Sequence, residues 1–313
     1  MIRLRRQILY AIMGWSLLRS SRPAAAQTPA ATAAAEAQPQ TDDDLQKLRL
    51  KVDVSSRMTV PVTIDGQGPF AFLIDTGSDR TVISRELAEY LKLPAGPLVT
   101  MHESTGVEEV TTVVVRRLRI GDRMIDRIEA PNLAEEDLGA QGLLGVDCLR
   151  DLHIVMDFET KRLSVSPSRP EPADPDTIVV TGRNRYGQLI LVDARVRGVG
   201  VLVVLDSGAQ LSVGNPALLR LLYGPNANRP ARGQAEIVSV SGRRMTVELD
   251  DVSEANVGGL LIRNMRLAFA QLHTFDRFGL TQQPALLLGM DVMSKCRRVS
   301  VDLRRREATF TLD

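Results

Sequence analysis

The amino-acid sequence predicts an all-β protein of two similar lobes, and three observations support this fold class. From Leu48 onward the chain consists of short Val-, Ile- and Leu-rich runs with turn residues between them, a pattern typical of strands. Helical stretches are few and short, with helical spacing at residues 85–92 and 215–222. The 313 residues amount to roughly two domains of usual size, and the two halves repeat the same landmarks in the same order.

The first 26 residues have the order of a secretory signal. A basic start is followed by the apolar run 7–18 and by small residues up to Ala26. This run is shorter than the ~20 residues that an unassisted membrane helix needs. We expect cleavage after Ala26 and export to the periplasm or the medium, through a general secretory or a twin-arginine route. An uncleaved membrane anchor is the alternative.

Composition divides the rest of the chain. Residues 27–47 are rich in Ala, Gln, Pro, Thr and Asp, bury little apolar surface, and are predicted to form a disordered tether. Residues 48–165 and 185–313 form the predicted N-terminal and C-terminal lobes. Residues 166–184 are predicted to be the linker between them, because their first part is rich in proline.

The predicted helices are short. The stretch 85–92 has helical spacing of apolar residues. In the stretch 215–222, Asn215 is expected to cap the helix and Pro216 to take its first position.

The repeat is most specific at one tetrapeptide. In each half, an apolar strand runs directly into Asp-Thr-Gly or Asp-Ser-Gly. The residues are Asp75, Thr76, Gly77 and Ser78 in the first half and Asp206, Ser207, Gly208 and Ala209 in the second. Each half then passes a glycine-centred apex and reaches Leu-Leu-Gly-x-Asp. The apex glycines are Gly106 and Gly242, and the later motifs end at Asp147 and Asp291.

With these motifs in matching order, the chain resembles the aspartic proteases, specifically a bacterial-type exported enzyme with a retropepsin-like module duplicated in one chain. The resemblance covers roughly residues 50–165 and 185–312. By chance an Asp-Thr/Ser-Gly triplet arises on the order of once per few thousand positions, so two in equivalent frames are a strong signal. The resemblance implies two acid-protease β-barrel lobes with short helices and pseudo-two-fold symmetry.

The chemistry of the motif leads to the same conclusion. A strand ending in Asp delivers a carboxylate at the edge of an apolar core. If the two loops face each other, Asp75 and Asp206 lie side by side and cannot both ionise, so one holds a proton while the other activates water. The sequence therefore predicts an aspartic-type endopeptidase, a hydrolase that needs no metal or other cofactor and binds an extended polypeptide substrate.

The resemblance also assigns supporting residues. Thr76 and Ser207 are expected to cross-link the two loops through hydroxyl-to-backbone bonds. Gly106 and Gly242 are expected at or near the tips of two flaps that close over the peptide.

Two further expectations concern carboxylates. Asp147 and Asp291 are interpreted as N-caps of the short helices that follow them. The Ser78 hydroxyl is expected to donate to Asp75 and favour its ionised form. Because Ala209 offers no such donor, Asp206 is predicted to be the member of the pair that is more often protonated.

Charge and composition exclude other classes of protein. With 39 basic and 38 acidic residues, the net charge of +1 gives no one-signed surface for nucleic acid. The three histidines and two cysteines have no metal-ligand spacing, so no metal site is expected. His102, near Gly106, is interpreted as a solvated flap residue or a substrate contact, and no pairing is predicted for His153 or His273.

Several alternatives remain open at this point. Cys148 and Cys296 either form a disulfide between the lobes or stay as buried free thiols. The protein is either a general protease, a protease limited to itself or one tethered partner, or a non-catalytic peptide-binding protein on the same scaffold. A monomer is expected, and a membrane protein is one candidate substrate.

Overall fold

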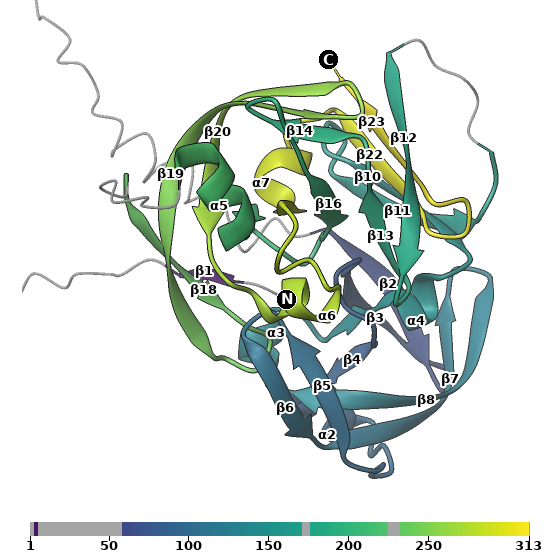
Figure 1. Ribbon diagram of the computed structural model, residues 1–313. Helices are drawn as coiled ribbons and strands as arrows, with labels where there is room; N and C mark the ends of the chain where they lie inside the picture. The colour runs from purple at the N-terminus through teal and green to yellow at the C-terminus, as the bar shows by residue number, and fades with distance from the viewer. Residues whose placement is uncertain (1–2, 6–57, 171–175, 225–231, 313) are drawn as a thin grey trace, which may run out of the picture. The chain divides into compact units, whose positions relative to one another are not determined.

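The computed structural model describes residues 3–5, 58–170, 176–224 and 232–312. Within these ranges the chain runs through the same series of strands and short helices twice (Figure 1). The all-β class predicted from the sequence is confirmed. The predicted cleavage site after Ala26 and the predicted tether 27–47 lie outside the described residues, whereas β1 (Arg3–Arg5) pairs antiparallel with β18 (Gln234–Val238).

The N-terminal lobe is a closed barrel in the order β2-β3-β9-β4-β8-β7. Its strands are β2 (Thr59–Ile64), β3 (Gln67–Ile74), β4 (Val82–Ser84), β7 (Thr112–Ile120), β8 (Arg123–Leu133) and β9 (Gly142–Leu144). In β2 and β3 every second residue is buried over part of the strand, as expected for a strand with one face on the core. The barrel thus places the end of β3 against β9, with which it pairs in parallel.

The C-terminal lobe repeats these pairings. Its strands are β13 (Gln188–Leu191), β14 (Ala194–Val196), β15 (Val199–Gly200), β16 (Leu202–Leu205), β17 (Val213–Gly214), β18, β19 (Arg244–Val257), β20 (Leu260–Phe269) and β21 (Ala285–Leu288). The strand β16 pairs in parallel with β21, as β3 does with β9. The strand β17 lies between β20 and β21 as β4 lies between β8 and β9.

One sheet joins the two halves of the chain. Its strands are β10 (Leu152–Asp157), β11 (Arg162–Pro167), β12 (Thr177–Arg185), β22 (Arg298–Asp302) and β23 (Glu307–Thr311), in the order β12-β23-β22-β10-β11. The strand β12 occupies much of the second part of the predicted linker. Its Thr177–Val180 residues pair with Phe310 and its neighbours, so the strand-free part of the linker is shorter than predicted.

Short helices and two hairpins complete the fold. The helices are α2 (Arg85–Tyr90), α3 (Glu135–Leu138), α4 (Val146–Leu149), α5 (Pro216–Tyr223), α6 (His273–Arg277) and α7 (Met290–Met293). Asn215 caps α5 by accepting from the Leu218 amide at 2.9 Å, with proline at the first position, as predicted. Among the described helices, none is long and apolar enough to cross a membrane.

A single apolar cluster extends through both lobes. It contains Ile74 and Leu144 from the first and Leu205 and Leu288 from the second, each at most 5% exposed. These residues directly precede the two Asp-containing motifs or lie beside them. The apolar, low-dielectric interior therefore extends to both aspartates.

Candidate active site

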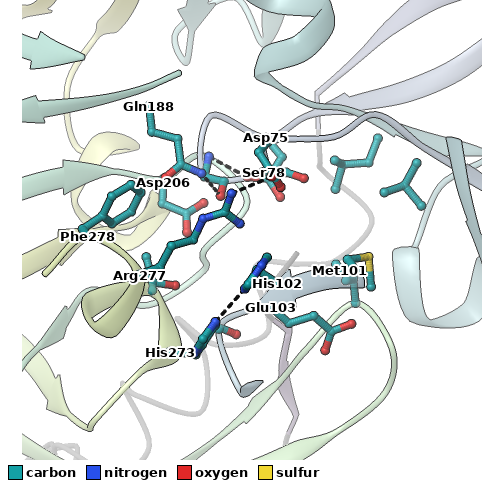
Figure 2. A pocket seen from close by; sticks show the side chains of 17 residues that line it. Asp75, Ser78, Met101, His102, Glu103, Gln188, Asp206, His273, Arg277 and Phe278 are labelled. Carbon is teal, nitrogen blue, oxygen red and sulfur yellow. Dashed lines mark hydrogen bonds and ion pairs between the residues drawn. The ribbon is translucent and has the colours of Figure 1, made fainter. Parts of the chain in front are cut away.

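Asp75 and Asp206 occupy equivalent positions at the ends of parallel strand pairs. The Asp75 amide donates to the Leu144 carbonyl oxygen at 3.0 Å, and the Asp206 amide donates to the Leu288 carbonyl oxygen at 3.1 Å. The two residues are only 2% and 7% exposed. Both line one pocket, where Figure 2 shows them next to each other. The structure thus brings together the pair predicted from two separate motifs.

The glycines after the two aspartates allow this approach. The Gly77 amide donates to Asp75 Oδ1 at 2.8 Å, and the Gly208 amide donates to Asp206 Oδ1 at 2.9 Å. A Cβ atom on Gly77 would overlap the Asp206 carboxyl group, and one on Gly208 would overlap that of Asp75. Each loop therefore packs its glycine against the aspartate of the other loop, which leaves no space for a side chain.

Thr76 and Ser207 cross-link the loops as predicted. The Thr76 hydroxyl donates to the Leu205 carbonyl oxygen at 3.0 Å and accepts from the Ser207 amide at 3.1 Å. In return, the Ser207 hydroxyl donates to the Ile74 carbonyl oxygen at 3.0 Å and accepts from the Thr76 amide at 3.1 Å. These four bonds hold the loops in fixed register, with both hydroxyls used as donor and acceptor.

The pKa of Asp206 is raised far above that of an ordinary carboxyl group. Burial, and next the negative charge of Asp75, raise the pKa of Asp206 to about 8, against the lowering effect of the Gly208 amide. At neutral pH Asp206 is therefore the protonated member of the coupled pair, in agreement with the prediction.

The predicted cause of this inequality is wrong. The Ser78 hydroxyl donates to the Arg80 carbonyl oxygen at 2.8 Å. It is thus used within the turn that follows Asp75.

The predicted N-caps are also wrong. The N-cap residues of α4 and α7 are Gly145 and Gly289, and neither Asp147 nor Asp291 caps the helix. Asp147 instead accepts from the Thr81 hydroxyl at 2.7 Å, and Asp291 accepts from the Ser212 hydroxyl at 2.6 Å. Each carboxylate therefore holds the segment that leads from an Asp-containing loop into the next strand. The N-cap position of the helix is taken by the preceding Gly, whose backbone is extended.

The sequence model of the family described as "Aspartyl protease" matches residues 60–148 and 192–292, which together make up more than half of the chain. The chain belongs to the aspartyl protease family. Solved structures also match, among them a retropepsin-like aspartic protease from Rickettsia conorii at 14% identity. That match covers 44% of this chain and 90% of the other, with a TM-score of 0.31. No curated protein matches.

Two hairpins of this member of the aspartyl protease family contribute residues to the pocket that contains Asp75 and Asp206. The first joins β5 (Val99–Glu103) and β6 (Gly106–Val110), and Gly106 follows its two-residue turn. The second joins β18 and β19, and Gly242 lies in its turn, where the Gly242 amide donates to the Ser239 carbonyl oxygen at 3.0 Å. The two predicted apex glycines are therefore at or next to the hairpin turns.

The hairpins contact each other. The Ser241 hydroxyl donates to Glu103 Oε2 at 2.8 Å, and Arg243 lies 3.3 Å from Glu108 Oε2. Val240 packs in an apolar cluster with Met101 of the first hairpin. The structure is therefore a state in which the hairpins are closed on each other above the pocket.

Two contacts of α6 with the N-terminal lobe were not predicted from the sequence. His102 Nδ1 and His273 Nε2 are 2.8 Å apart, and the two rings are stacked with an angle of 5° between their planes. Arg277 forms an ion pair with Asp79 at 2.8 Å, and all four residues line the pocket (Figure 2). Since 171 positions separate the two histidines, no local pattern could have paired them.

The two cysteines do not pair with each other in the described part of the chain. Cys148 and Cys296 are both buried and are not joined by a disulfide, so the disulfide alternative is not realised. Burial, and next the charge of Asp147, raise the pKa of Cys148 to about 12, so its thiol stays protonated. No group of three or more His, Cys, Asp or Glu side chains within the described ranges is arranged to hold a metal ion.

Proposed function

We propose that this protein is an aspartic endopeptidase that hydrolyses peptide bonds with Asp75 and Asp206 as its catalytic dyad. The observation that supports this most is the pair of buried carboxyl groups in cross-linked loops, one with its pKa raised to about 8. Structural carboxylates are normally paired with cations or placed in water. Two of them held together in one pocket at the cost of burial are typical of acid–base chemistry.

In the proposed mechanism, ionised Asp75 takes a proton from water as the water oxygen attacks the peptide carbonyl carbon. The proton on Asp206 passes to the carbonyl oxygen, so a neutral tetrahedral diol forms. Collapse then returns a diol proton to Asp206, while Asp75 delivers its proton to the amide nitrogen as the carbon–nitrogen bond breaks. Both carboxyl groups end in their starting states.

The proposed substrate is a polypeptide in an extended conformation. An extended chain offers main-chain donors and acceptors along its length, and the pocket lies between the dyad and two antiparallel hairpins that can contact such a chain. Because the hairpins are in contact with each other, they must separate for the substrate to enter.

The direct test is to incubate the purified mature chain with a diverse peptide mixture, with and without a statine-containing inhibitor, and to identify new termini by mass spectrometry. We expect inhibitor-sensitive cleavage that Asp75→Asn and Asp206→Asn each reduce at least about 1,000-fold. Asp122→Asn, at an exposed turn, is the matched control and should leave the rate unchanged.

Three outcomes of this test are informative. Binding of the inhibitor without cleavage by the parent would replace the protease with a peptide-binding protein. Cleavage that persists in both dyad variants would assign the activity to other residues. Restored activity on mixing the two variants would mean that the lobes pair between chains instead of within one.

We also propose that the protein is exported. Support comes from the basic start, the apolar run 7–18 and the small residues that precede Gln27. Protein made in a secreting host should begin at or near Gln27 when its N-terminus is determined by mass spectrometry. An intact Met1 in the membrane fraction would instead indicate an anchored enzyme.

A further inference from the structure

Gln188 reaches from the C-terminal lobe to the dyad loop of the N-terminal lobe. It is the first residue of β13 and is 5% exposed. Its Nε2 donates to the Gly77 carbonyl oxygen, and its side chain lines the same pocket as Asp75 and Asp206. In Figure 2 the Gln188 side chain extends toward the two aspartates.

A tight turn fixes this position. Tyr186 and Gly187 both have positive φ, as in a two-residue hairpin turn between β12 and β13. The Gly187 amide donates to Asn184 Oδ1 at 2.9 Å, and a Cβ atom on Gly187 would press on Val146 of the other lobe. Gln188 is thus delivered by a hairpin tip that already abuts the N-terminal lobe, so its side chain has little freedom to withdraw.

The bond to Gly77 also sets the orientation of the amide. A carbonyl oxygen only accepts, so the donor end of the Gln188 amide must face Gly77. The acceptor end, Oε1, is therefore turned away from that carbonyl. Among the described residues, no group forms a hydrogen bond with Oε1, although the atom is buried. A buried acceptor without a partner costs free energy that a suitably placed donor would recover.

We propose that Gln188 is a substrate-binding residue whose Oε1 accepts a hydrogen bond from a main-chain N–H of the peptide bound in the cleft. A main-chain N–H is the donor that every residue of an extended peptide except proline offers, so this contact would fix the register of the chain over the dyad without selecting a side chain. The proposal rests on the proposed peptidase function.

The test is a double-mutant cycle with a modified backbone. A statine-containing peptide inhibitor is prepared with all amides and as a series of analogues, each with one amide N–H replaced by an ester oxygen. Dissociation constants are measured for the parent and for Gln188→Met, which has nearly the same shape and no polar end. Gln282→Met, at an exposed position of the same lobe, is the control.

We expect one ester analogue to bind the parent about five- to tenfold more weakly than the all-amide inhibitor, which is the usual loss for one neutral hydrogen bond. The same ester should cause no loss in Gln188→Met, and the other esters should cause equal losses in both proteins. Gln282→Met should behave as the parent. Should Gln188→Met not fold, Gln188→Asn, which withdraws the amide by one methylene, is measured in its place.

Ester losses that are the same in the parent and the variant would overturn the proposal, and Gln188 would then be only a contact between the lobes. A shifted pH–rate profile without coupling to any ester would also overturn it and place the action of Gln188 on the dyad. An inhibitor that binds neither parent nor variant would instead contradict the peptidase function itself.

Discussion

The two lobes place their aspartates in the same way but surround them differently. In both lobes a parallel strand pair ends at the aspartate, a glycine packs against the opposite carboxyl group, and a Thr or Ser hydroxyl crosses to the other loop. The next position differs, with Asp79 in the first lobe and Gln210 in the second. Asp79 pairs with Arg277 of α6 across the pocket.

The helices α3 and α6 follow the equivalent strands β8 and β20, and the charges of their side chains also differ. The first turn of α3 is acidic, with Glu135, Glu136 and Asp137, whereas α6 directs His273 and Arg277 into the pocket. The comparison indicates that the two halves of the duplicated chain match where the two aspartates are held and differ in the residues that line the rest of the pocket. Each of the following predictions breaks or sharpens that distinction.

The largest effect is expected from the two symmetric glycines. Gly77→Ala and Gly208→Ala should each lower kcat/KM about 100-fold or more, because the added methyl displaces the opposite carboxyl group. Overpacking should also cost about 1–3 kcal/mol of stability. Gly200→Ala, where nothing lies within 4 Å, is the control. Unequal losses in kcat/KM for the two variants would show that the two loops contribute unequally to the reaction, although their geometry is equivalent.

The second prediction concerns the proton on Asp206 and is measured as stability against pH. An unfolded Asp titrates near pH 3.9, whereas the folded pKa of Asp206 is raised to about 8. Between these values the folded state binds more protons, so its stability falls as pH rises, with a slope on the order of 1 kcal/mol per pH unit. Asp206→Asn should remove this contribution. As pH rises from 4 to 8, the melting temperature of the parent should therefore fall relative to that of the variant.

Asp75→Asn sharpens the same comparison. It removes the charge that helps to raise the pKa of Asp206 but leaves the burial of Asp206 in place. The pH slope of its stability should therefore lie between those of the parent and of Asp206→Asn. If the melting temperatures of all three proteins changed in parallel with pH across this range, the assignment of the proton to Asp206 would be contradicted.

A smaller effect is expected at the histidine pair, which only one side of the pocket has. Burial, followed by the charges of Arg277 and His273, lowers the pKa of His102, while Asp79 opposes this. Because the folded state favours the neutral ring, the contact contributes above about pH 6.5 and weakens as pH falls. His102→Asn should raise KM a few-fold at pH 7 and less at pH 5.

Hydrogen exchange of the β5–β6 hairpin, corrected for the intrinsic pH dependence, provides a second measurement of the same contact. Parent protection should decline toward the level of His102→Asn as pH falls from 7 to 5. Thr100→Asn, exposed on the same strand, is the control. Protection in the parent that stays constant over this pH range would mean that the histidines do not hold the hairpin closed.

The smallest effect is expected from Ser78→Ala, which makes the first loop resemble the second at the position of Ala209. Since the hydroxyl donates to the Arg80 carbonyl oxygen, its loss should cost about 0.5–1.5 kcal/mol of stability and leave the pH–rate profile superimposed on that of the parent. An upward shift of the acidic limb would instead place the hydroxyl on Asp75.

Local motifs predicted the centre of the site well. Asp75, Thr76 and Gly77 lie in one short motif, and the second copy at Asp206 made the prediction specific. Apolar periodicity likewise predicted the strands and α5, because alternate burial and an Asn-Pro cap are local properties.

Predictions that depended on the choice between nearby partners were less successful. Asp147 lies one residue inside α4 and meets Thr81, which is 66 positions away. The Ser78 hydroxyl had two acceptors within a few residues, and the turn decided between them. His102, His273 and Gln188 meet their partners only after the two lobes pack, so nothing in their immediate neighbours could indicate their role.

The sheet shared between the halves has a consequence for how the chain is made. The strand β22 pairs with β10, and β23 pairs with both β22 and β12, so strands that are synthesised after both aspartates lie in the middle of this sheet. Until Arg298–Thr311 have been synthesised, β10 and β12 have no partner between them, and this part of the connection between the lobes is missing. The order of strands therefore means that this sheet, which connects the two lobes, is completed only after the strands of both lobes have been synthesised.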